Sequence, residues 1–212
     1  MKQLYPDLWQ TPKELRFGVL TSHAYVLEHN AGHDMIYVAE EPETLATVKT
    51  AFGVQHLYMS HNHEISEGLA NAASALDAQL VGHQNMRKFF PEDFSLDHAI
   101  ETDGTATLAG GIEAIHTPGH TDNNVCYLYA SPHGETYLFV GDAIYLDRGS
   151  WKTLVVTGDG GSTEDLHRSL ETLGKRHVEV IITSLSIGPT EIVEVSQPQW
   201  QAIVRKLIND LG

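Results

Sequence analysis

Two histidines placed two residues apart could bind one metal ion together. His61 and His63 directly follow an apolar segment, residues 54–59, whose composition is typical of a strand. In an extended chain, alternate side chains point to the same side. We therefore expect both imidazoles to face one cation.

Two further residues extend this set of donors. His120 lies in a Pro-Gly-His-Thr run at residues 118–121, where proline and glycine turn the backbone sharply. Asp142 follows the apolar residues 137–140. Three imidazoles and a carboxylate suit Zn²⁺, and two imidazoles with a carboxylate also suit Fe²⁺. The sequence thus predicts one zinc or iron ion per chain, with the ligands His61, His63, His120 and Asp142.

The elements that must position these ligands are alternating strands and helices. Apolar and β-branched runs predict strands, and apolar residues at helical spacing predict helices. Ser162 is the expected N-cap of one helix. Hairpins such as the turn at residues 132–134 favour mixed sheets over a purely parallel sheet. The expected strands are 17–28, 35–39, 54–59, 79–81, 105–108, 112–116, 125–130, 137–140 and 178–183, and the expected helices are 42–52, 66–76, one from about 163 and one from about 198.

Length and charge favour a single globular domain that does not bind nucleic acids or anionic membranes. The 212 residues suit one domain, 1–212, and a hydrophobic fraction of 42% is enough for a substantial core. The net charge is −15, from 13 basic and 28 acidic side chains. Such a surface disfavours nucleic acid and anionic membranes, which attract basic proteins. We expect a small-molecule substrate as the partner, and the oligomeric state stays open, with a homodimer as one option.

Cysteine content and the distribution of apolar residues suggest a location. Cys126 is the only cysteine, so no disulfide can form within the chain, and we expect it to be a core residue. Residues 1–10 lack the pattern of a signal peptide, and no apolar run is long enough to span a membrane. The expected location is the cytoplasm.

In these motifs the chain resembles the metallo-β-lactamase superfamily. That family's pattern is Thr-His-x-His-x-Asp-His-x-Gly, then Pro-Gly-His-Thr, then Gly-Asp, then a last histidine near Gly-His-Gly. Here Ser-His-Asn-His-Glu-Ile-Ser-Glu-Gly stands at 60–68, Pro-Gly-His-Thr at 118–121 and Gly-Asp at 141–142. The match runs from the strands near Phe17 to the strand at Val180. The resemblance implies an α/β fold: a four-layer αβ/βα sandwich of two mixed sheets covered by helices, with the metal site at one edge.

The chain also departs from the family's pattern at three positions. Ile65 stands where the family has aspartate, and Ser66 where it has histidine. No histidine lies in 183–188, where Leu185 is the best alignment for the last one. In the family these three residues bind a second metal, and the carboxylate also orients the attacking water. The resemblance therefore implies that only the first metal's ligands survive, and that Asp142, which bridges two metals in the family, binds one or none.

Other side chains could compensate for these losses. His23 falls where the family often lines its pocket, and we name His23 and Asp142 as candidate catalytic residues, either of which could act as general base. Glu64 and Glu67 flank the lost positions. Either could replace the missing carboxylate, although acidic residues also favour a solvated helix N-terminus.

The leading functional hypothesis is a mononuclear metal-dependent hydrolase of a small ester, thioester or amide. One alternative is a non-catalytic descendant of the fold that binds a metal or metabolite. Another is a mononuclear iron oxygenase, because His63, His120 and Asp142 resemble the iron ligands of persulfide dioxygenases. Against this last reading, that branch normally keeps the Asp-His pair that is lost here.

Overall fold

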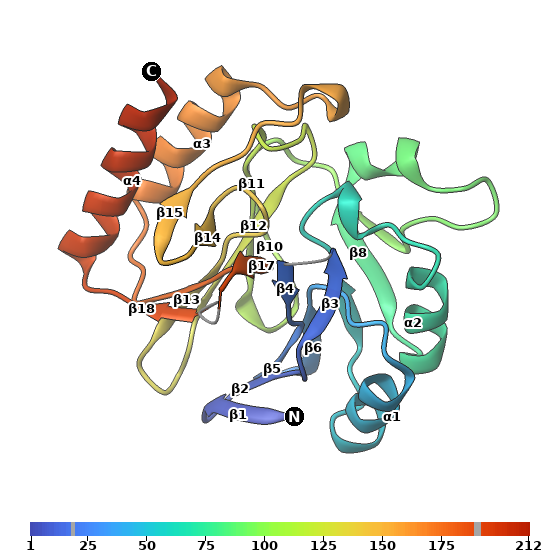
Figure 1. Cartoon of the computed structure of the whole chain (residues 1–212). Helices are drawn as coiled ribbons and strands as arrows, with labels where there is room; N and C mark the ends of the chain where they lie inside the picture. The colour runs from blue at the N-terminus through green and yellow to red at the C-terminus, as the bar shows by residue number, and fades with distance from the viewer. Residues whose placement is uncertain (18–19, 189–191) are drawn as a thin grey trace.

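Two large sheets pack face to face, and pairs of helices cover their outer faces (Figure 1). The computed structural model of the chain describes residues 1–17, 20–188 and 192–212. Among these residues, no helix is both long and apolar enough to cross a membrane. The order of layers is helices, sheet, sheet, helices, which confirms the predicted four-layer α/β sandwich.

The first sheet has seven strands in the order β1-β2-β5-β6-β7-β8-β9. Strands β6 to β9 run parallel, and the other neighbours are antiparallel, so the sheet is mixed, as predicted. Helices α1 (Pro42–Ala51) and α2 (Leu69–Leu76) cover its outer face (Figure 1). Its strands are β1 (Lys2–Tyr5), β2 (Leu8–Gln10), β5 (Tyr25–His29), β6 (Gly32–Ile36), β7 (His56–Tyr58), β8 (Gln79–His83) and β9 (His98–Ile100).

The second sheet has six strands in the order β10-β11-β12-β13-β16-β18 and is also mixed. Its outer face packs against α3 (Thr163–Gly174) and α4 (Gln197–Leu211). Its strands are β10 (Thr105–Thr107), β11 (Glu113–His116), β12 (Val125–Ala130), β13 (Thr136–Phe139), β16 (Val180–Ile182) and β18 (Ile192–Glu194).

Strand β13 shows how the second sheet is buried on both faces. Tyr137 and Phe139 belong to the core between the two sheets, whereas Leu138 and Val140 pack under α3 and α4. Successive side chains of a strand point to opposite faces, so an uninterrupted apolar run fills both cores. Cys126 on β12 is buried and free, as predicted.

The covering helices begin and pack largely as predicted. The Ser162 hydroxyl caps α3 by accepting a hydrogen bond from the Asp165 N–H at 3.1 Å. On α4, Val204 and Leu207 are buried, and Ile203, Ile208 and Leu211 are partly buried against the same core. Trp200, also on α4, is fully buried, and its indole N–H donates to the Leu173 carbonyl at 3.2 Å.

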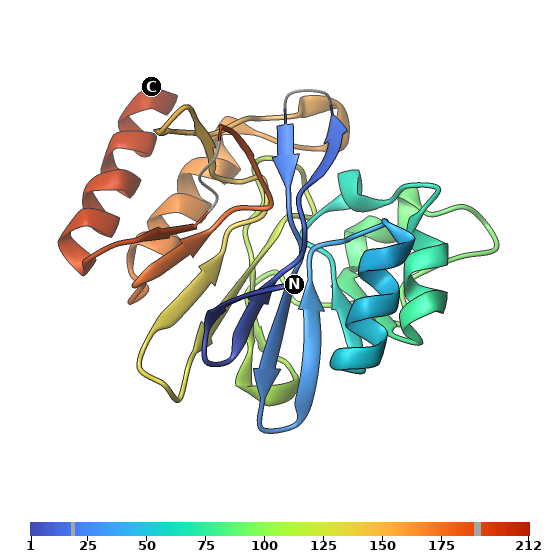
Figure 2. The same cartoon turned by 60° about the horizontal axis from the view of Figure 1, so that its bottom comes forward.

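A third sheet was not expected from the sequence. It has five strands in the order β15-β14-β17-β4-β3, and Figure 2 shows β3 and β4 projecting beyond one end of the large sheets. The prediction of one strand over 17–28 is therefore wrong, because residues 20–22 and 25–28 join different sheets; residues 18–19 lie outside the described residues. The five strands are β3 (Glu14–Phe17), β4 (Leu20–Ser22), β14 (Tyr145–Asp147), β15 (Ser150–Lys152) and β17 (Leu185–Ile187).

Gly119 lets the loop after β11 pass close to α3. Its φ is +142°, and a Cβ at this position would lie 2.4 Å from the Cα of Leu166. Only glycine combines this conformation with this close approach. The next residue is His120, so the contact with α3 fixes where that imidazole stands.

Replacement of Gly119 by alanine should therefore destabilise the metal-free protein by about 3 kcal/mol or more, since a backbone atom cannot move aside as a side chain could. Gly134→Ala is the matched control, because its φ is +123° but no atom lies within 4 Å of the added Cβ. Urea unfolding of both variants measures the difference. Equal losses of stability would show that the backbone conformation, not the contact with α3, explains the requirement for glycine.

Candidate metal centre

The structure brings the four predicted ligands together. One potential ligand atom from each of His61, His63, His120 and Asp142 lies within 4.8 Å of the others. The two histidines of the first pair follow β7 of the seven-stranded sheet, whereas His120 and Asp142 follow β11 and β13 of the six-stranded sheet. The cluster therefore lies beyond the C-terminal ends of strands from both sheets.

The local backbone at the His-x-His pair differs from the expected extended chain. His61 is extended, with φ −165° and ψ 173°, but residues Asn62–Glu64 form a short 3₁₀ turn. The ring centroids of His61 and His63 still lie 4.9 Å apart, and those of His61 and His120 lie 5.0 Å apart. The rings therefore converge through a turn rather than through strand alternation.

Hydrogen bonds fix which nitrogens of His63 and His120 face inward. His63 Nε2 donates to the Asp159 carboxylate at 2.6 Å, and His120 Nδ1 donates to the Leu154 carbonyl at 2.9 Å. In neutral imidazoles, the remaining nitrogens then carry lone pairs. These two atoms, His63 Nδ1 and His120 Nε2, lie 3.3 Å apart. Two facing lone pairs repel, so the geometry calls for a cation or a proton between them.

His61 is held in the same manner. Its Nδ1 lies 2.8 Å from the hydroxyl oxygen of Ser60, and that hydroxyl donates to Glu64 Oε1, so Nδ1–H is the donor to Ser60. Its Nε2 is buried, makes no hydrogen bond among the described residues, and lies 3.3 Å from Asp142 Oδ2. Partners that orient a ring through its outer nitrogen are typical of metal-bound histidines.

Asp142 supplies the negative charge of the cluster. Its Oδ1 accepts a hydrogen bond from Ser184, and its Oδ2 lies 3.8 Å from His120 Nε2. Burial opposes ionisation, but the positive charge of His61 outweighs it and holds the pKa of Asp142 well below its usual range. Burial likewise disfavours protonated His61, yet the Asp142 charge raises the pKa of His61 to about 10. Burial, followed by the His61 charge, lowers the pKa of His120 to about 4.

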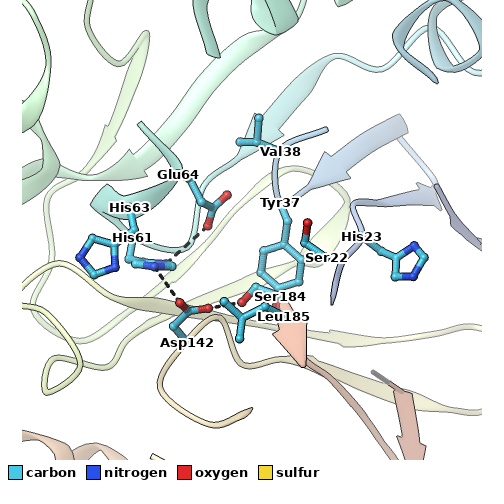
Figure 3. A pocket seen from close by; sticks show the side chains of 10 residues that line it. All are labelled: Ser22, His23, Tyr37, Val38, His61, His63, Glu64, Asp142, Ser184 and Leu185. Atoms are coloured by element: carbon cyan, nitrogen blue, oxygen red, sulfur yellow. Dashed lines mark hydrogen bonds and ion pairs between the residues drawn. The ribbon is translucent and has the colours of Figure 1, made fainter. Parts of the chain in front are cut away.

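Glu64 is buried, unlike Glu67, which is exposed. Its Oε1 also accepts from the Ser60 backbone N–H at 2.8 Å, while its Oε2 is buried without a hydrogen bond among the described residues. Figure 3 shows the carboxylate beside the His61 ring, on the opposite side from Asp142. The prediction of a solvated helix start is therefore wrong for Glu64, which reaches the metal centre through Ser60 and His61.

Comparison with known proteins identifies the family. A family model described as the metallo-beta-lactamase superfamily matches residues 44–184. The chain belongs to this superfamily. No curated protein matches its sequence.

Solved metallo-beta-lactamases have the same fold at low sequence identity. The one from Pontibacter korlensis is 21% identical, with a TM-score of 0.73 over 99% of this chain and 97% of that chain. The one from Hirschia baltica is 14% identical, with a TM-score of 0.73 over 96% and 94%. FIM-1 from Pseudomonas aeruginosa, solved in a mono-zinc form, is 13% identical, with a TM-score of 0.72 over 99% and 94%.

The three positions at which the chain departs from the superfamily pattern have other contacts. Ile65 is partly buried against the larger hydrophobic core, and the Ser66 hydroxyl donates to Glu40. Leu185, at the start of β17, lines the pockets beside the metal centre. An apolar side chain cannot bind a metal ion, so neither Ile65 nor Leu185 can supply a ligand.

His23 lines a small cavity of about 40 Å³ together with His61 and Asp142. Its Nδ1 lies 2.7 Å from the Thr11 carbonyl, to which it must donate. Figure 3 shows its ring turned away from the His61–Asp142 pair. This orientation gives no support to His23 as a general base.

A second group of possible ligands, His83, Asp103 and His116, lies apart from this centre. The two rings stack with centroids 3.8 Å apart and planes only 5° from parallel. Lone pairs in parallel ring planes do not converge on one point. His83 Nδ1 also accepts from the Asn85 N–H at 3.4 Å, which leaves the proton on the nitrogen facing Asp103. We therefore assign no metal ion to this group.

Metal binding at the centre should depend on pH. Below about pH 10, His61 carries a proton that a metal ion must displace, so affinity for zinc should rise about tenfold per pH unit between pH 6 and 8. Calorimetry in buffers of different ionisation enthalpy should show about one proton released per ion. An affinity that stays constant across this range would mean that His61 is not a ligand.

Glu64→Gln should weaken metal binding about 10- to 100-fold, because the amide keeps an oxygen for Ser60 but removes the charge that polarises His61. The metal-free protein should not lose stability, since burying a carboxylate is costly. Zinc affinity and thermal unfolding of this variant are compared with those of Glu67→Gln, at an exposed neighbouring position. If Glu64→Gln leaves the zinc affinity unchanged, the charge of Glu64 does not contribute to metal binding.

Proposed function

We propose that this metallo-β-lactamase superfamily chain is a mononuclear metal-dependent hydrolase of small esters, thioesters or amides. The ligands of its one zinc or iron ion are His61, His63, His120 and Asp142. One observation carries the proposal: the hydrogen bonds on the outer nitrogens of His63 and His120 leave two lone pairs facing each other at 3.3 Å. A divalent cation would resolve that repulsion and, unlike a single proton shared by the two rings, would also satisfy the buried Nε2 of His61, which makes no hydrogen bond among the described residues.

The donors fit such an ion in number and chemistry. Three neutral imidazoles with a carboxylate form a common zinc ligand set, and each of the three rings has an outer partner. A mono-zinc form is described for FIM-1, one of the structures with this fold. With Ile65 and Leu185 in place of second-metal ligands, one ion at this centre is the stoichiometry we propose.

A divalent ion bound here would polarise a substrate carbonyl and lower the pKa of a bound water. The chain's own contribution is orientation. Ser184 holds Oδ1 of Asp142, so that Oδ2 stays directed at the cluster. In the metal-free protein the positive charge of His61 keeps Asp142 ionised, so a charged carboxylate is already in place for an incoming ion.

The test is the replacement of His120 by alanine. The variant should lose the metal ion and any hydrolysis of aryl esters and thioesters, whereas the thermal midpoint of the metal-free protein should change little, because the site lies at the sheet edges. His133→Ala, at an exposed hairpin position, is the matched control. Metal content is measured by mass spectrometry after loading with zinc or iron.

Three outcomes would change the assignment. Hydrolysis that persists in His120→Ala would place the active site elsewhere. If the parent protein binds the ion but hydrolyses no ester, thioester or amide, a non-catalytic descendant of the fold would be favoured. A large drop in metal-free stability would mean that His120 is structural.

A further inference from the structure

The third sheet presents an apolar face to the metal centre. Leu185 on β17 is aligned with Ser22 on β4, and Ser186 is aligned with Thr21. Because side chains alternate along a strand, Leu185 and Ile187 lie on one face, and Leu20 lies on that face too. The parallel alignment of β14 with β17 adds Tyr145 to the same face.

These side chains form one wall of a pocket that ends on the metal centre. The pocket has a volume of about 380 Å³ and is also lined by Leu154, His63, His120 and Asp142. Pockets of this size typically hold a small organic molecule. The apolar wall thus adjoins three of the four candidate metal ligands, where a scissile carbonyl would lie.

The charges around the pocket disfavour an anionic substrate tail. Among the described residues that line it, none is lysine or arginine, and Asp142 is the only carboxylate. Asp147 is aligned with Ile187 in the neighbouring strand and so lies on the same face of the sheet. Lys152 is aligned with Tyr145 on the outermost strand of this sheet, but it is exposed and does not line the pocket. A carboxylate at the far end of a substrate would therefore approach Asp147 inside a lining that holds no cation, which costs free energy.

We propose that the pocket binds an uncharged, apolar acyl chain of medium length. The substrate is then an acyl ester or thioester whose carbonyl lies at the metal centre and whose alkyl chain lies on Leu20, Leu185 and Ile187. The inference rests on the proposed hydrolase function for the reaction. It goes further in naming the substrate class and the residues that select it.

The chain-length dependence of hydrolysis tests this assignment. Zinc-loaded protein is assayed with 4-nitrophenyl or thioester substrates from acetyl to decanoyl. Each added methylene should raise kcat/KM about fourfold until the pocket is full, which corresponds to about 0.8 kcal/mol per buried methylene. The monoester of adipic acid should be hydrolysed at least about tenfold less efficiently than the hexanoyl ester, because no cation lines the pocket and its free carboxylate would lie on the same face as Asp147. A flat profile, or a preference for the adipoyl substrate, would overturn the proposal.

A pair of matched variants tests whether the chain-length dependence arises at the apolar wall of the pocket. Ile187→Ser should reduce kcat/KM for the octanoyl substrate about tenfold more than kcat/KM for the acetyl substrate. Ile203→Ser makes the same chemical change on α4, where the side chain is also partly buried but lies outside the pocket. It should alter neither value. Equal effects of the two variants would overturn the assignment of the wall.

A binding measurement separates this proposal from the hydrolase function. Methyl NMR spectra of the metal-free protein are recorded during titration with N-methylhexanamide, which is neutral, carries its alkyl chain on the acyl side and should stay intact without the metal ion. The methyl signals of Leu154, Leu185 and Ile187 should shift, and that of Ile203 should not. If no substrate is hydrolysed but these signals shift, the hydrolase proposal fails and the acyl pocket stands. If the signals do not shift, the acyl pocket is wrong.

Discussion

The repulsion between two inward-facing imidazole nitrogens is the constraint around which the site is organised. His63 Nδ1 and His120 Nε2 face each other at 3.3 Å because Asp159 and the Leu154 carbonyl hold the opposite sides of the rings. His61 is held in the same way by Ser60. The sandwich supplies these partners from loops at the ends of different strands, so the fold maintains an arrangement that a cation stabilises.

Much of the fold could be predicted from the sequence because its large elements carry strong periodic patterns. The apolar runs of β12 and β13 and the stripes of α3 and α4 fill two continuous cores. The third sheet could not be predicted, since its strands are only three or four residues long and come from distant parts of the chain. Such short strands show too few alternations to reveal a period, and their pairing depends on tertiary structure.

The candidate ligands could be found from the sequence, because each follows a strand and belongs to a short motif. Their supporting partners could not. Asp159 lies almost a hundred residues from His63, and its contact depends on how the loop before α3 folds back. Glu64 was considered as a replacement carboxylate, but its role through Ser60 required the 3₁₀ turn that the expected extended chain lacked. Local patterns thus located the donors, whereas the surrounding hydrogen bonds depend on long-range packing.

The separation of the third sheet from the two large sheets has an evolutionary consequence. The metal ligands follow strands of the sandwich, whereas the apolar wall of the pocket belongs to short strands at its end. A substitution at Leu20 or Ile187 alters the wall without touching a ligand or its hydrogen-bonding partner. Descendants of this chain could therefore diverge in the molecules they accept while inheriting the same reactive centre.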